Sequence, residues 1–483
     1  MDSRLYLSPS KHPYSKRSSR HGSPLKMKQP FDAYSSPSKS RHNSIITPSA
    51  PVTNTNIKVI VRFRPPSEQE PGEYGRTIVD YSEKHEAVTI TTTNHTFQFD
   101  HIFPEQTEQE EIFNYSVKQT TEDLAAGYNG TVLCYGQTGS GKSYTMMGEL
   151  ETDKKKGLIP RIFEQIFRII EQSPKTLEYT VGVSYMEIYN ETLRDLLNSE
   201  NNSKLQIHEN KVDGVFVSHL ETLYVADLVD VYTILEQGNL NRSTGATNMN
   251  EQSSRSHAIF QIKLSSKNLE DGVIKSGNLF LVDLAGSEKI DKTCATGQTL
   301  EEAKRINSSL SALGNVIYSL TDGKSAHVPY RDSKLTRILQ ESLGGNSRTT
   351  LIINCSPTLY NEQETLSTLR FASRAKRIQN SVHVNSELSN SELKKRYLEE
   401  VKTNGERQIK IQKLSEENEM LRKELKKYKD LVETMKSNGN NSGTVKESIG
   451  VPLSANGLSE MTKKPNGANF NLNDTILDLK LQN

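Results

Sequence analysis

The chain of 483 residues has no tryptophan, only three cysteines and almost no net charge. Cys134, Cys294 and Cys355 are too few and too far apart for a disulfide framework or a zinc site, and they favour a reducing compartment. No apolar run approaches the roughly 18 residues of a membrane span, and the N-terminus has no apolar signal core. The net charge of +1 argues against a globally basic nucleic-acid-binding protein. We therefore expect a cytoplasmic protein whose partners include neither a membrane nor a nucleic acid.

The N-terminal segment is rich in serine, proline and basic residues, and this composition predicts a disordered arm. It contains S-P-x-K tetrads that begin at Ser8, Ser23 and Ser36. Such tetrads suit proline-directed kinases, and each phosphate would add about two negative charges to the arm. The alternative is that a segment of this composition forms such tetrads by chance.

Composition divides the rest of the chain as well. We expect the basic arm at residues 1–55, a large folded domain at 56–379, a linker at 376–390, a helix with a coiled coil at 391–437 and a disordered tail at 438–483. In the folded domain, β-rich runs alternate with amphipathic helices, which predicts an α/β sheet covered on both faces. The expected strands include 57–63, 132–135, 179–185 and 278–284, and the expected helices include 110–127, 161–172, 299–320 and 334–342.

The most informative run is 136–143, which reads G-x-x-x-x-G-K-S and follows the apolar run 131–135. In this phosphate-binding motif, glycines let the backbone wrap a triphosphate while successive N–H groups point at its oxygens. A lysine reaches the outer phosphates and a hydroxyl ligates Mg²⁺. The predicted nucleotide-binding residues are Gly136, Gln137, Thr138, Gly139, Ser140, Gly141, Lys142 and Ser143.

Two polar segments suit a sensor of the terminal phosphate. Asp283 ends an apolar strand and can hold the Mg²⁺ shell through water, while the N–H of Gly286 can reach the γ-phosphate. Upstream, the hydroxyl-rich loop 250–257 reads N-E-Q-S-S-R-S-H. The N-K-V-D tetrad at 210–213 is typical of guanine recognition, but it precedes the D-x-x-G element that it should follow. We therefore expect ATP rather than GTP.

In their order and spacing, these motifs resemble those of the kinesin motor domain. The matching runs are R-F-R-P at 62–65, G-Q-T-G-S-G-K-S at 136–143, N-x-x-S-S-R-S-H at 250–257, D-L-A-G-S-E at 283–288 and V-P-Y-R-D-S-K-L-T-R at 328–337. The resemblance covers about residues 56–435 and is strongest to conventional kinesins of fungi. It implies a P-loop fold with an eight-stranded mixed sheet between helices, and a microtubule-stimulated ATPase that uses ATP and Mg²⁺.

The resemblance also assigns roles to matching residues. Those on the adenine side are Arg62, Arg64 and Pro65. Those linked to Mg²⁺ are Ser143, Ser254 and Asp283. The catalytic set is Ser253, Arg255, Gly286 and Glu288, in which an Arg255–Glu288 salt bridge closes the site over ATP and orders the attacking water. The alternative for that pair is an ordinary surface ion pair.

Kinesins bind microtubules, whose surface is acidic, so the resemblance implies a cationic contact face. Its candidates are Lys289, Lys292, Arg331, Lys334 and Arg337. The last three are three residues apart, so we expect them on one side of a helix, where they would bind mainly by electrostatics. The alternative is a solvated helix face.

Residues 376–388 resemble the kinesin neck linker, which docks on the motor domain when ATP binds. The resemblance assigns Ile378 as an apolar plug and Asn385 as a backbone latch. It also predicts a short strand at about 53–56 that pairs with the docked linker. Because the motor domain precedes the linker and the coil, movement toward the plus end is implied.

A heptad pattern follows the linker. Position a holds Ile411, Asn418, Leu425 and Val432, and position d holds Leu414, Leu421, Tyr428 and Met435. A buried asparagine at position a favours a parallel dimer, so we expect a weak homodimer through residues 411–435. The alternative is one amphipathic helix that lies on the folded domain.

Two functions are consistent with this sequence. The first is a dimeric motor that moves along microtubules of the cytoskeleton; the second is a tether that binds microtubules without productive hydrolysis. The complete set of nucleotide-site motifs favours the motor. A basic arm is unusual in conventional kinesins, and no long stalk or basic tail follows the coil, which argues against vesicle transport and tail autoinhibition.

Substitution Asn418→Leu tests the coil. Removing a polar residue from the expected seam should raise the thermal stability of the helix and loosen the choice of oligomer. Sedimentation of the wild type and the variant at micromolar concentration measures both species, and two monomers would contradict the coiled coil.

Overall fold

The computed structural model describes residues 52–68, 70, 72–199, 204–210, 214–244, 252–288, 298–325, 327–387 and 390–438. The predicted kinase sites of the arm and the predicted tail lie outside these residues. Contacts divide the chain into two compact units, with the boundary between Lys395 and Arg396. No helix in the described part of the chain combines the length and the apolarity needed to cross a membrane.

The strands are β1 (Thr53–Asn56), β2 (Lys58–Phe63), β3 (Val79–Tyr81), β4 (Ala87–Ile90), β5 (His95–Gln98), β6 (His101–Phe103), β7 (Gly130–Tyr135), β8 (Leu177–Tyr189), β9 (Thr192–Asp195), β10 (Gln206–Asn210), β11 (Gly214–Ser218), β12 (Leu223–Tyr224), β13 (His257–Asn268), β14 (Ile274–Asp283), β15 (Arg348–Cys355), β16 (Gln379–Val382) and β17 (Ser386–Glu387). The α-helices are α1 (Gln109–Ser116), α2 (Lys118–Ala125), α3 (Lys142–Met146), α4 (Leu158–Gln172), α5 (Leu228–Thr244), α6 (Gln298–Thr321), α7 (Lys334–Ile338), α8 (Glu362–Ala375) and α9 (Asn390–Asn438). Short 3-10 helices include η3 (Gln252–Arg255), η5 (Tyr330–Asp332) and η6 (Leu359–Asn361).

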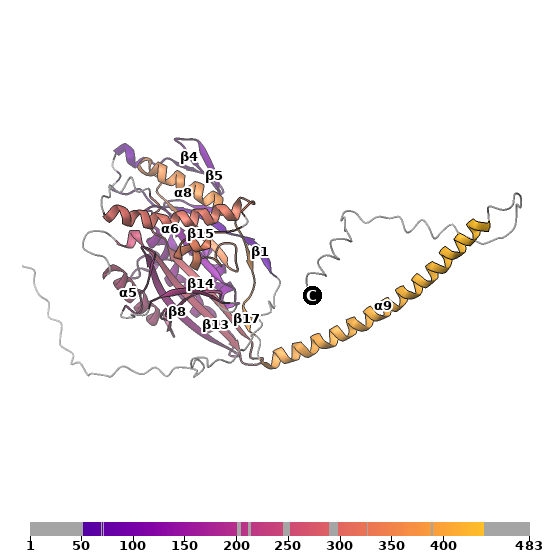
Figure 1. The fold of residues 1–483 in the computed structure, drawn as a ribbon. Coiled ribbons are helices and arrows are strands. Elements are labelled where there is room, and N and C mark those ends of the chain that lie inside the picture. The colour runs from indigo at the N-terminus through magenta and orange to yellow at the C-terminus, as the bar shows by residue number, and fades with distance from the viewer. Residues whose placement is uncertain are drawn as a thin grey trace, which may run out of the picture. The chain divides into compact units, whose positions relative to one another are not determined.

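A mixed sheet runs through the first unit in the order β12-β8-β13-β14-β7-β15-β2-β6, with β9 and β17 added at its side (Figure 1). The pairs from β12 to β14 are antiparallel, whereas β14, β7, β15, β2 and β6 pair in parallel. The predicted mixed sheet between helices is thereby confirmed, and its continuous path has the eight strands that were expected.

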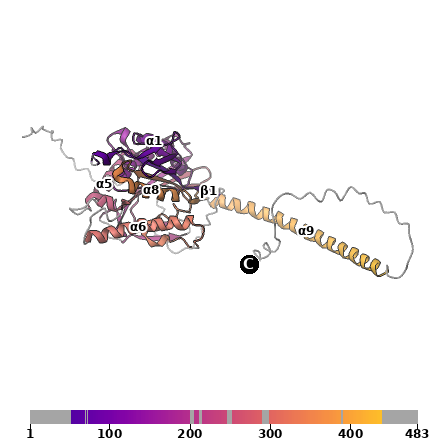
Figure 2. The same cartoon turned by 90° about the horizontal axis from the view of Figure 1, so that it is seen from above.

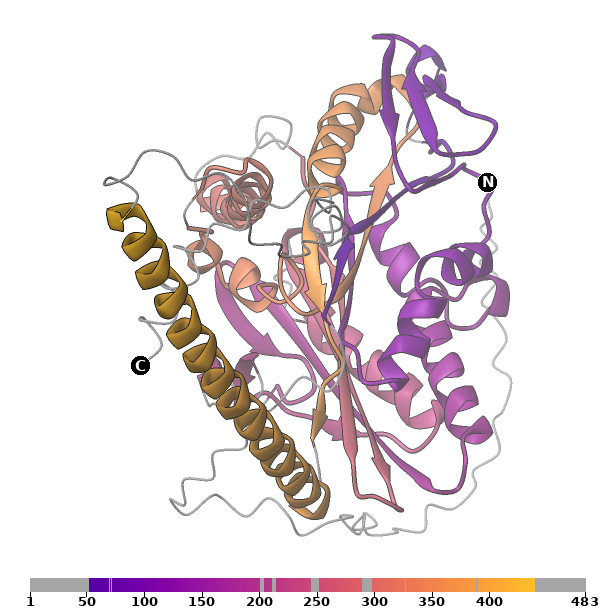
Figure 3. The same ribbon diagram turned by 90° about the vertical axis from the view of Figure 1, so that its right-hand side faces the viewer.

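The sheet buries both faces, because successive side chains of a strand point in opposite directions. In β2, Val59 and Val61 join one buried cluster, which includes side chains of α6, α7 and α8. Ile60 joins a second cluster, which includes side chains of α1, α2, α4 and α5. Figure 3 shows the orange and salmon helices on one side of the sheet and violet helices on the other, and α6 and α8 pack side by side (Figure 2).

Three predicted helices end differently in the structure. The helix expected at 110–127 is divided into α1 and α2 at Val117, whose φ of −131° is not helical. The helix after the phosphate-binding motif, α3, has only five residues. The helix expected at 334–342 is the short α7, which begins at a capping box formed by Ser333 and Thr336. Local sequence predicts helix type well, but tertiary packing decides where these helices stop.

The linker lies along the first unit as added β-structure. Strand β16 pairs antiparallel with β1, so that Asn54 is opposite Ser381, and β17 pairs with the start of β14. Ile378, the expected plug, is buried in the first cluster. Asn385 donates from Nδ2 to the backbone oxygens of Gly127 and Ser276. The expected strand at 53–56, the plug and the latch contact are all confirmed.

Asn380 anchors the linker from within. Its side chain is 1 % exposed, and its Oδ1 accepts the N–H of Gly344 at 2.7 Å. Its Nδ2 donates to the carbonyl oxygens of Ser342 and Ser347 at 3.0 and 2.6 Å. These three partners belong to the loop between α7 and β15, and Nδ2 also donates to the hydroxyl of Thr349 in β15 at 3.1 Å, so Asn380 joins the linker to that loop and to the strand after it.

The second unit contains most of α9, which is one helix from Asn390 to Asn438. The heptad residues with described side chains are exposed in the single chain: Ile411, Leu414, Asn418, Leu421, Leu425, Tyr428 and Val432. A row of exposed apolar residues on one helix is consistent with the predicted seam, and the dimer stays a prediction.

Substitution Asn380→Ala should release the linker without unfolding the sheet. The change leaves buried backbone groups unpaired, which costs about 1–3 kcal/mol, and the loss falls on the docked linker. Hydrogen exchange of the amides in β16 measures this loss relative to β13. The exposed neighbour Gln379, changed to alanine, is the control; equal protection in the two variants would rule out the anchor.

Candidate nucleotide-binding site

The site is built where parallel strands end at one edge of the sheet. Strand β7 lies between β14 and β15, with Cys134 opposite both Asp283 and Ile352. The phosphate-binding loop leaves β7 at this edge, and Asp283 is the last residue of β14. Carboxyl ends of parallel strands form the usual ligand crevice of an open α/β sheet.

Three glycines of the loop are required by its geometry. Gly139 and Gly141 have φ of 73° and 95°, in the region that favours glycine. A Cβ atom on Gly136, whose φ is 155°, would lie 2.1 Å from the carbonyl oxygen of Asn354 on β15. The loop is therefore wrapped tightly against β15.

Lys142 lies across the inside of the loop. Its Nζ donates to the carbonyl oxygens of Gly136 and Gln137, at 3.0 and 2.8 Å. Burial lowers the pKa of Lys142 below its ordinary value, while the negative charges of Asp283 and Glu288 act in the opposite direction. An ammonium group held this way costs desolvation energy that a bound phosphate would offset.

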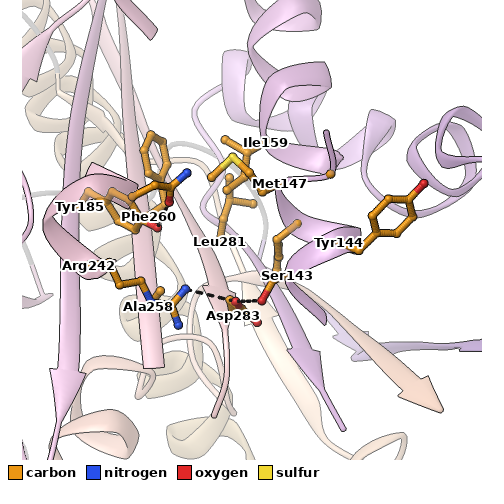
Figure 4. Close-up of a pocket in the computed structure, with 13 residues that line it drawn as sticks. Ser143, Tyr144, Met147, Ile159, Tyr185, Arg242, Ala258, Phe260, Leu281 and Asp283 are labelled. Atoms are coloured by element: carbon orange, nitrogen blue, oxygen red, sulfur yellow. Dashed lines mark hydrogen bonds and ion pairs between the residues drawn. The ribbon is translucent and has the colours of Figure 1, made fainter. Parts of the chain in front are cut away.

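Ser143 and Asp283 meet at the end of the loop. The Ser143 hydroxyl donates to Oδ2 of Asp283 at 2.6 Å, and Arg242 of α5 contacts the same oxygen at 3.4 Å (Figure 4). Arg242 also lies 3.8 Å from the buried carboxylate of Glu187. Ser143, Asp283 and Arg242 line a cavity of about 280 Å³, whose walls come from α3, α4, α5, β8, β13 and β14. The sequence gives Arg242 and Glu187 no motif, so reasoning from it missed this buried charge network.

The residues present fit ATP and Mg²⁺. Oδ1 of Asp283 is buried and has no hydrogen-bond partner among the described residues, as expected of a carboxylate that faces the water shell of a cation. The Ser143 hydroxyl lies beside it. No cluster of three His, Cys, Asp or Glu side chains suited to a metal occurs in the described part of the chain. Mg²⁺ held mainly by phosphate oxygens needs no such cluster.

Hydrogen bonds join the two predicted sensor segments to the phosphate-binding loop. The N–H of Gly286 donates to the carbonyl oxygen of Ser254 at 2.9 Å, and the N–H of Ser287 donates to that of Gly136 at 3.1 Å. The Glu288 carboxylate accepts from the N–H and the hydroxyl of Thr138, at 2.8 and 2.6 Å. An anionic group of the protein therefore already occupies an N–H of the phosphate-binding loop.

Arg255 and Ser253 belong to η3, directly before β13. Arg255 is half-buried. The short helix brings Ser254 against Gly286, so the structure places the two sensor segments beside each other, as predicted from the sequence.

His257 connects this region to α6. Its ring is buried, its Nδ1 accepts the N–H of Ala285 at 3.0 Å, and its Nε2 lies 2.7 Å from the hydroxyl of Ser309. A ring that accepts at Nδ1 is neutral and carries its proton on Nε2. Burial, followed by the nearby charges of Arg242 and Lys142, lowers the pKa of His257 to about 3.

On the side predicted to hold adenine, the two arginines bond mainly to the protein. Arg62 is buried and donates to Gln109 and Thr145, both at 2.8 Å. Arg64 donates to the carbonyl oxygen of Gly139 and pairs with Glu70 at 2.5 Å. The two arginines therefore support the phosphate-binding loop and the helix after it through hydrogen bonds to Gly139 and Thr145. Pro65, the next residue, is exposed. The exposed ring of Tyr144, 5.2 Å from the Arg62 guanidinium, was missed because no motif marks it.

The cationic cluster departs from the prediction. Arg331 belongs to η5, and the extended Ser333 separates it from Lys334 and Arg337 of α7, so the three do not share one helix. Arg331 is exposed. Arg337 pairs with Glu209 of β10 at 2.5 Å, so its charge is balanced by a carboxylate of the β10–β11 hairpin. Lys289 and Lys292 lie outside the described residues.

Comparison with known proteins gives one consistent result. A profile of the family "Kinesin motor domain" matches residues 62–378. The chain is 58% identical over 341 residues to "Kinesin heavy chain" of Gibberella moniliformis, covering 70% of this chain and 36% of that protein. It is 55% identical over 343 residues to "Kinesin-like protein 3" of Schizosaccharomyces pombe, covering 71% of this chain and 62% of the relative.

A solved structure agrees. The structure reported as "Structure of a fast kinesin: Implications for ATPase mechanism and interactions with microtubules" matches with a TM-score of 0.65 and 57% identity. The match covers 70% of this chain and 96% of the other. The chain spans only 36% to 39% of the length of the fungal kinesin heavy chains with 57% to 58% identity.

The buried imidazole predicts a pH-dependent stability. His257 is neutral in the folded state down to its pKa of about 3, whereas an unfolded histidine takes up a proton below about pH 6.5. The contribution of the neutral, buried His257 ring to the free energy of unfolding is therefore complete above about pH 6.5 and is lost progressively as pH falls toward 3. At pH 5 the loss is about 2 kcal/mol.

Denaturant unfolding at about pH 7 and pH 5 measures this loss. His257→Asn should be less stable at neutral pH but should lose about 2 kcal/mol less between these two values. The exposed His95, changed to asparagine, is the control and should leave the pH slope of the wild type unaltered. If stability fell with pH as steeply in His257→Asn as in the wild type, another group would be the cause of the acid sensitivity.

Proposed function

The chain belongs to the kinesin motor domain family, and from this premise we propose that it is a microtubule-stimulated ATPase that moves along microtubules. The observation that carries the proposal is the pair of backbone hydrogen bonds among Gly136, Ser254, Gly286 and Ser287. Through them, the loop that binds phosphate and the segments that respond to it form one connected unit. A change at the γ-phosphate can therefore move both segments.

In this proposal, the phosphate-binding loop and Lys142 hold the phosphates of ATP. Tyr144 offers its exposed ring to the base, and Arg62 stacks near that ring. Ser143, Ser254 and Asp283 hold Mg²⁺, which neutralises charge on the phosphates when it is bound. Positioning and charge stabilisation of this kind are the main requirements of phosphoryl transfer.

Closure of the site requires Glu288 to change partners. Its carboxylate rests on Thr138, where it competes with phosphate oxygens for the same N–H. We infer that ATP displaces it toward Arg255, and that the resulting pair orders the attacking water together with Ser253 and the N–H of Gly286, once that N–H has left the carbonyl oxygen of Ser254. The exchange replaces one anion on the loop with another, so its free-energy cost is small enough for a reversible switch.

Strand β14 offers a direct route from the site to the linker. Asp283 at its end contacts Ser143, and Ile274 at its start pairs with Glu387 of β17. A second route passes through the loop after α7, which binds Asn380. We propose that these two routes let the nucleotide state decide whether the linker is docked.

The proposal also covers the microtubule contact, the dimer, the direction of movement and the place where the protein acts. Lys289, Lys292, Arg331 and Lys334 contact the acidic microtubule surface, and Arg337 holds the β10–β11 hairpin beside α7 through its ion pair with Glu209. Two chains join through residues 411–435, and the motor domain ahead of the linker gives movement toward the plus end. The protein acts in the cytoplasm on the microtubule cytoskeleton, and proline-directed kinases act on the arm at 1–55. Segment boundaries at 56–379, 376–390, 391–437 and 438–483 complete the proposed organisation.

ATP turnover with and without microtubules tests the proposal. Lys142→Ala should lose nucleotide binding, because no other ammonium group reaches the carbonyls inside the loop in the described structure. Glu288→Ala should still bind ATP but lower turnover by about 10²–10³. Matched controls are the exposed Lys154 and Glu171, each changed to alanine. A wild-type chain that binds microtubules without faster hydrolysis would instead be a tether.

A further inference from the structure

A further contact holds the docked linker, beside those made by Asn380 and Asn385. Asn346, in the loop between α7 and β15, uses both atoms of its side-chain amide. Its Oδ1 accepts the backbone N–H of His383 at 2.9 Å. Its Nδ2 donates to Oδ1 of Asn385 at 3.0 Å and lies 3.0 Å from Nε2 of His383. One side chain therefore contacts the linker at three atoms.

The orientation of the Asn346 amide follows from its partners. A backbone N–H can only donate, so the amide oxygen must face the N–H of His383. The amide nitrogen, which can only donate, must then face Nε2 of the imidazole. Nε2 can accept only when the ring is neutral with its proton on Nδ1.

Protonation of the His383 ring turns this hydrogen bond into a repulsive contact between two donors. An imidazolium carries hydrogen on both nitrogens, so that Nε2–H would point at the Nδ2 donor of Asn346. Turning the amide over does not help, because its nitrogen would then face the N–H of His383. We propose that Asn346 and His383 form a second latch, which holds the docked linker only while the imidazole is neutral. The inference rests on the proposed docking cycle and adds its dependence on protons.

Charged groups on the surrounding elements change the strength of the latch, but they do not form its hydrogen bonds. Glu341, in the same loop, accepts the backbone N–H of Asn346 at 3.0 Å and favours a nearby cation. Arg348 of β15, paired with Asp123 of α2, and Lys275 of β14 lie on the adjoining strands. These charges act through solvent and partly cancel. The direction of the pH dependence is therefore set by whether Nε2 of His383 accepts or donates a hydrogen bond.

The sign of the pH dependence follows directly. Docking requires the neutral ring, so it is favoured at high pH and weakens as the ring takes up a proton on acidification. The same loop binds Asn380 through Gly344, so the latch acts on a linker that keeps its other anchor. Acidification should therefore loosen the linker rather than unfold the head.

The test uses the full chain with a spin label on the linker. Cys134 and Cys355 are buried, so replacing Cys294 by serine and Glu387 by cysteine gives one reactive position on β17. Label mobility with a non-hydrolysable ATP analogue, without microtubules, reports the ratio of docked to free linker. We expect that ratio to fall when the pH is lowered from about 7.5 to about 5.8.

Variants at the two latch residues separate the cause from general acid effects. His383→Gln keeps an acceptor oxygen and should remove the pH response. His383→Lys should leave the linker free at both pH values. Asn346→Asp should reverse the direction, because a carboxylate accepts from both the backbone N–H and an imidazolium. A fall in His383→Gln equal to that of the wild type, or no fall in the wild type, would overturn the latch.

Microtubule-stimulated turnover at about pH 7.5 distinguishes this inference from the proposed function. His383→Gln should turn over ATP like the wild type at that pH. If the wild type shows no stimulation, the proposed function fails, whereas the label still reports whether protons control the linker. If stimulation is normal but the label ignores pH, only the second latch is wrong.

Discussion

The parallel pairing of β7 with β14 and β15 is the constraint on which the rest of the structure depends. It ends the strands at one edge and sets Cys134 opposite Asp283, so that the loop after β7 begins beside the carboxylate at the end of β14. The same pairing presses Gly136 against the backbone of β15. Without this register, Lys142, Ser143 and Asp283 could not face one bound phosphate group.

The linker shows how a weak interaction can be made responsive. Its strands add to an existing sheet edge through short pairings, and three asparagines complete the contact. Asn380 is buried, whereas Asn346 and Asn385 are only half-buried. Neutral amide hydrogen bonds each contribute about 1 kcal/mol, so the docked state rests on a small number of weak contacts, as the proposed release by the nucleotide or by His383 requires.

Several features of the site could be predicted because they are local. The glycine and lysine spacing of the phosphate-binding loop, the strand before it and the carboxylate at the end of β14 are all adjacent in sequence to a recognisable pattern. Arg242, Glu187 and His257 are different, because their importance comes from burial beside Asp283 and Ala285. No spacing rule reveals which charged side chains a fold will desolvate together.

Residue patterns alone were enough to predict the α/β class and the family to which the motor domain belongs, and the arm, the linker and the heptad helix were proposed from the same kind of pattern. These depend on periodicity and short motifs, which act within a few residues. Only the tertiary structure decided that Ser333 separates Arg331 from α7, that Arg337 pairs with Glu209, and that Asn346 meets His383. Those contacts join segments distant in sequence, and their geometry follows from sheet register and packing rather than from local preference.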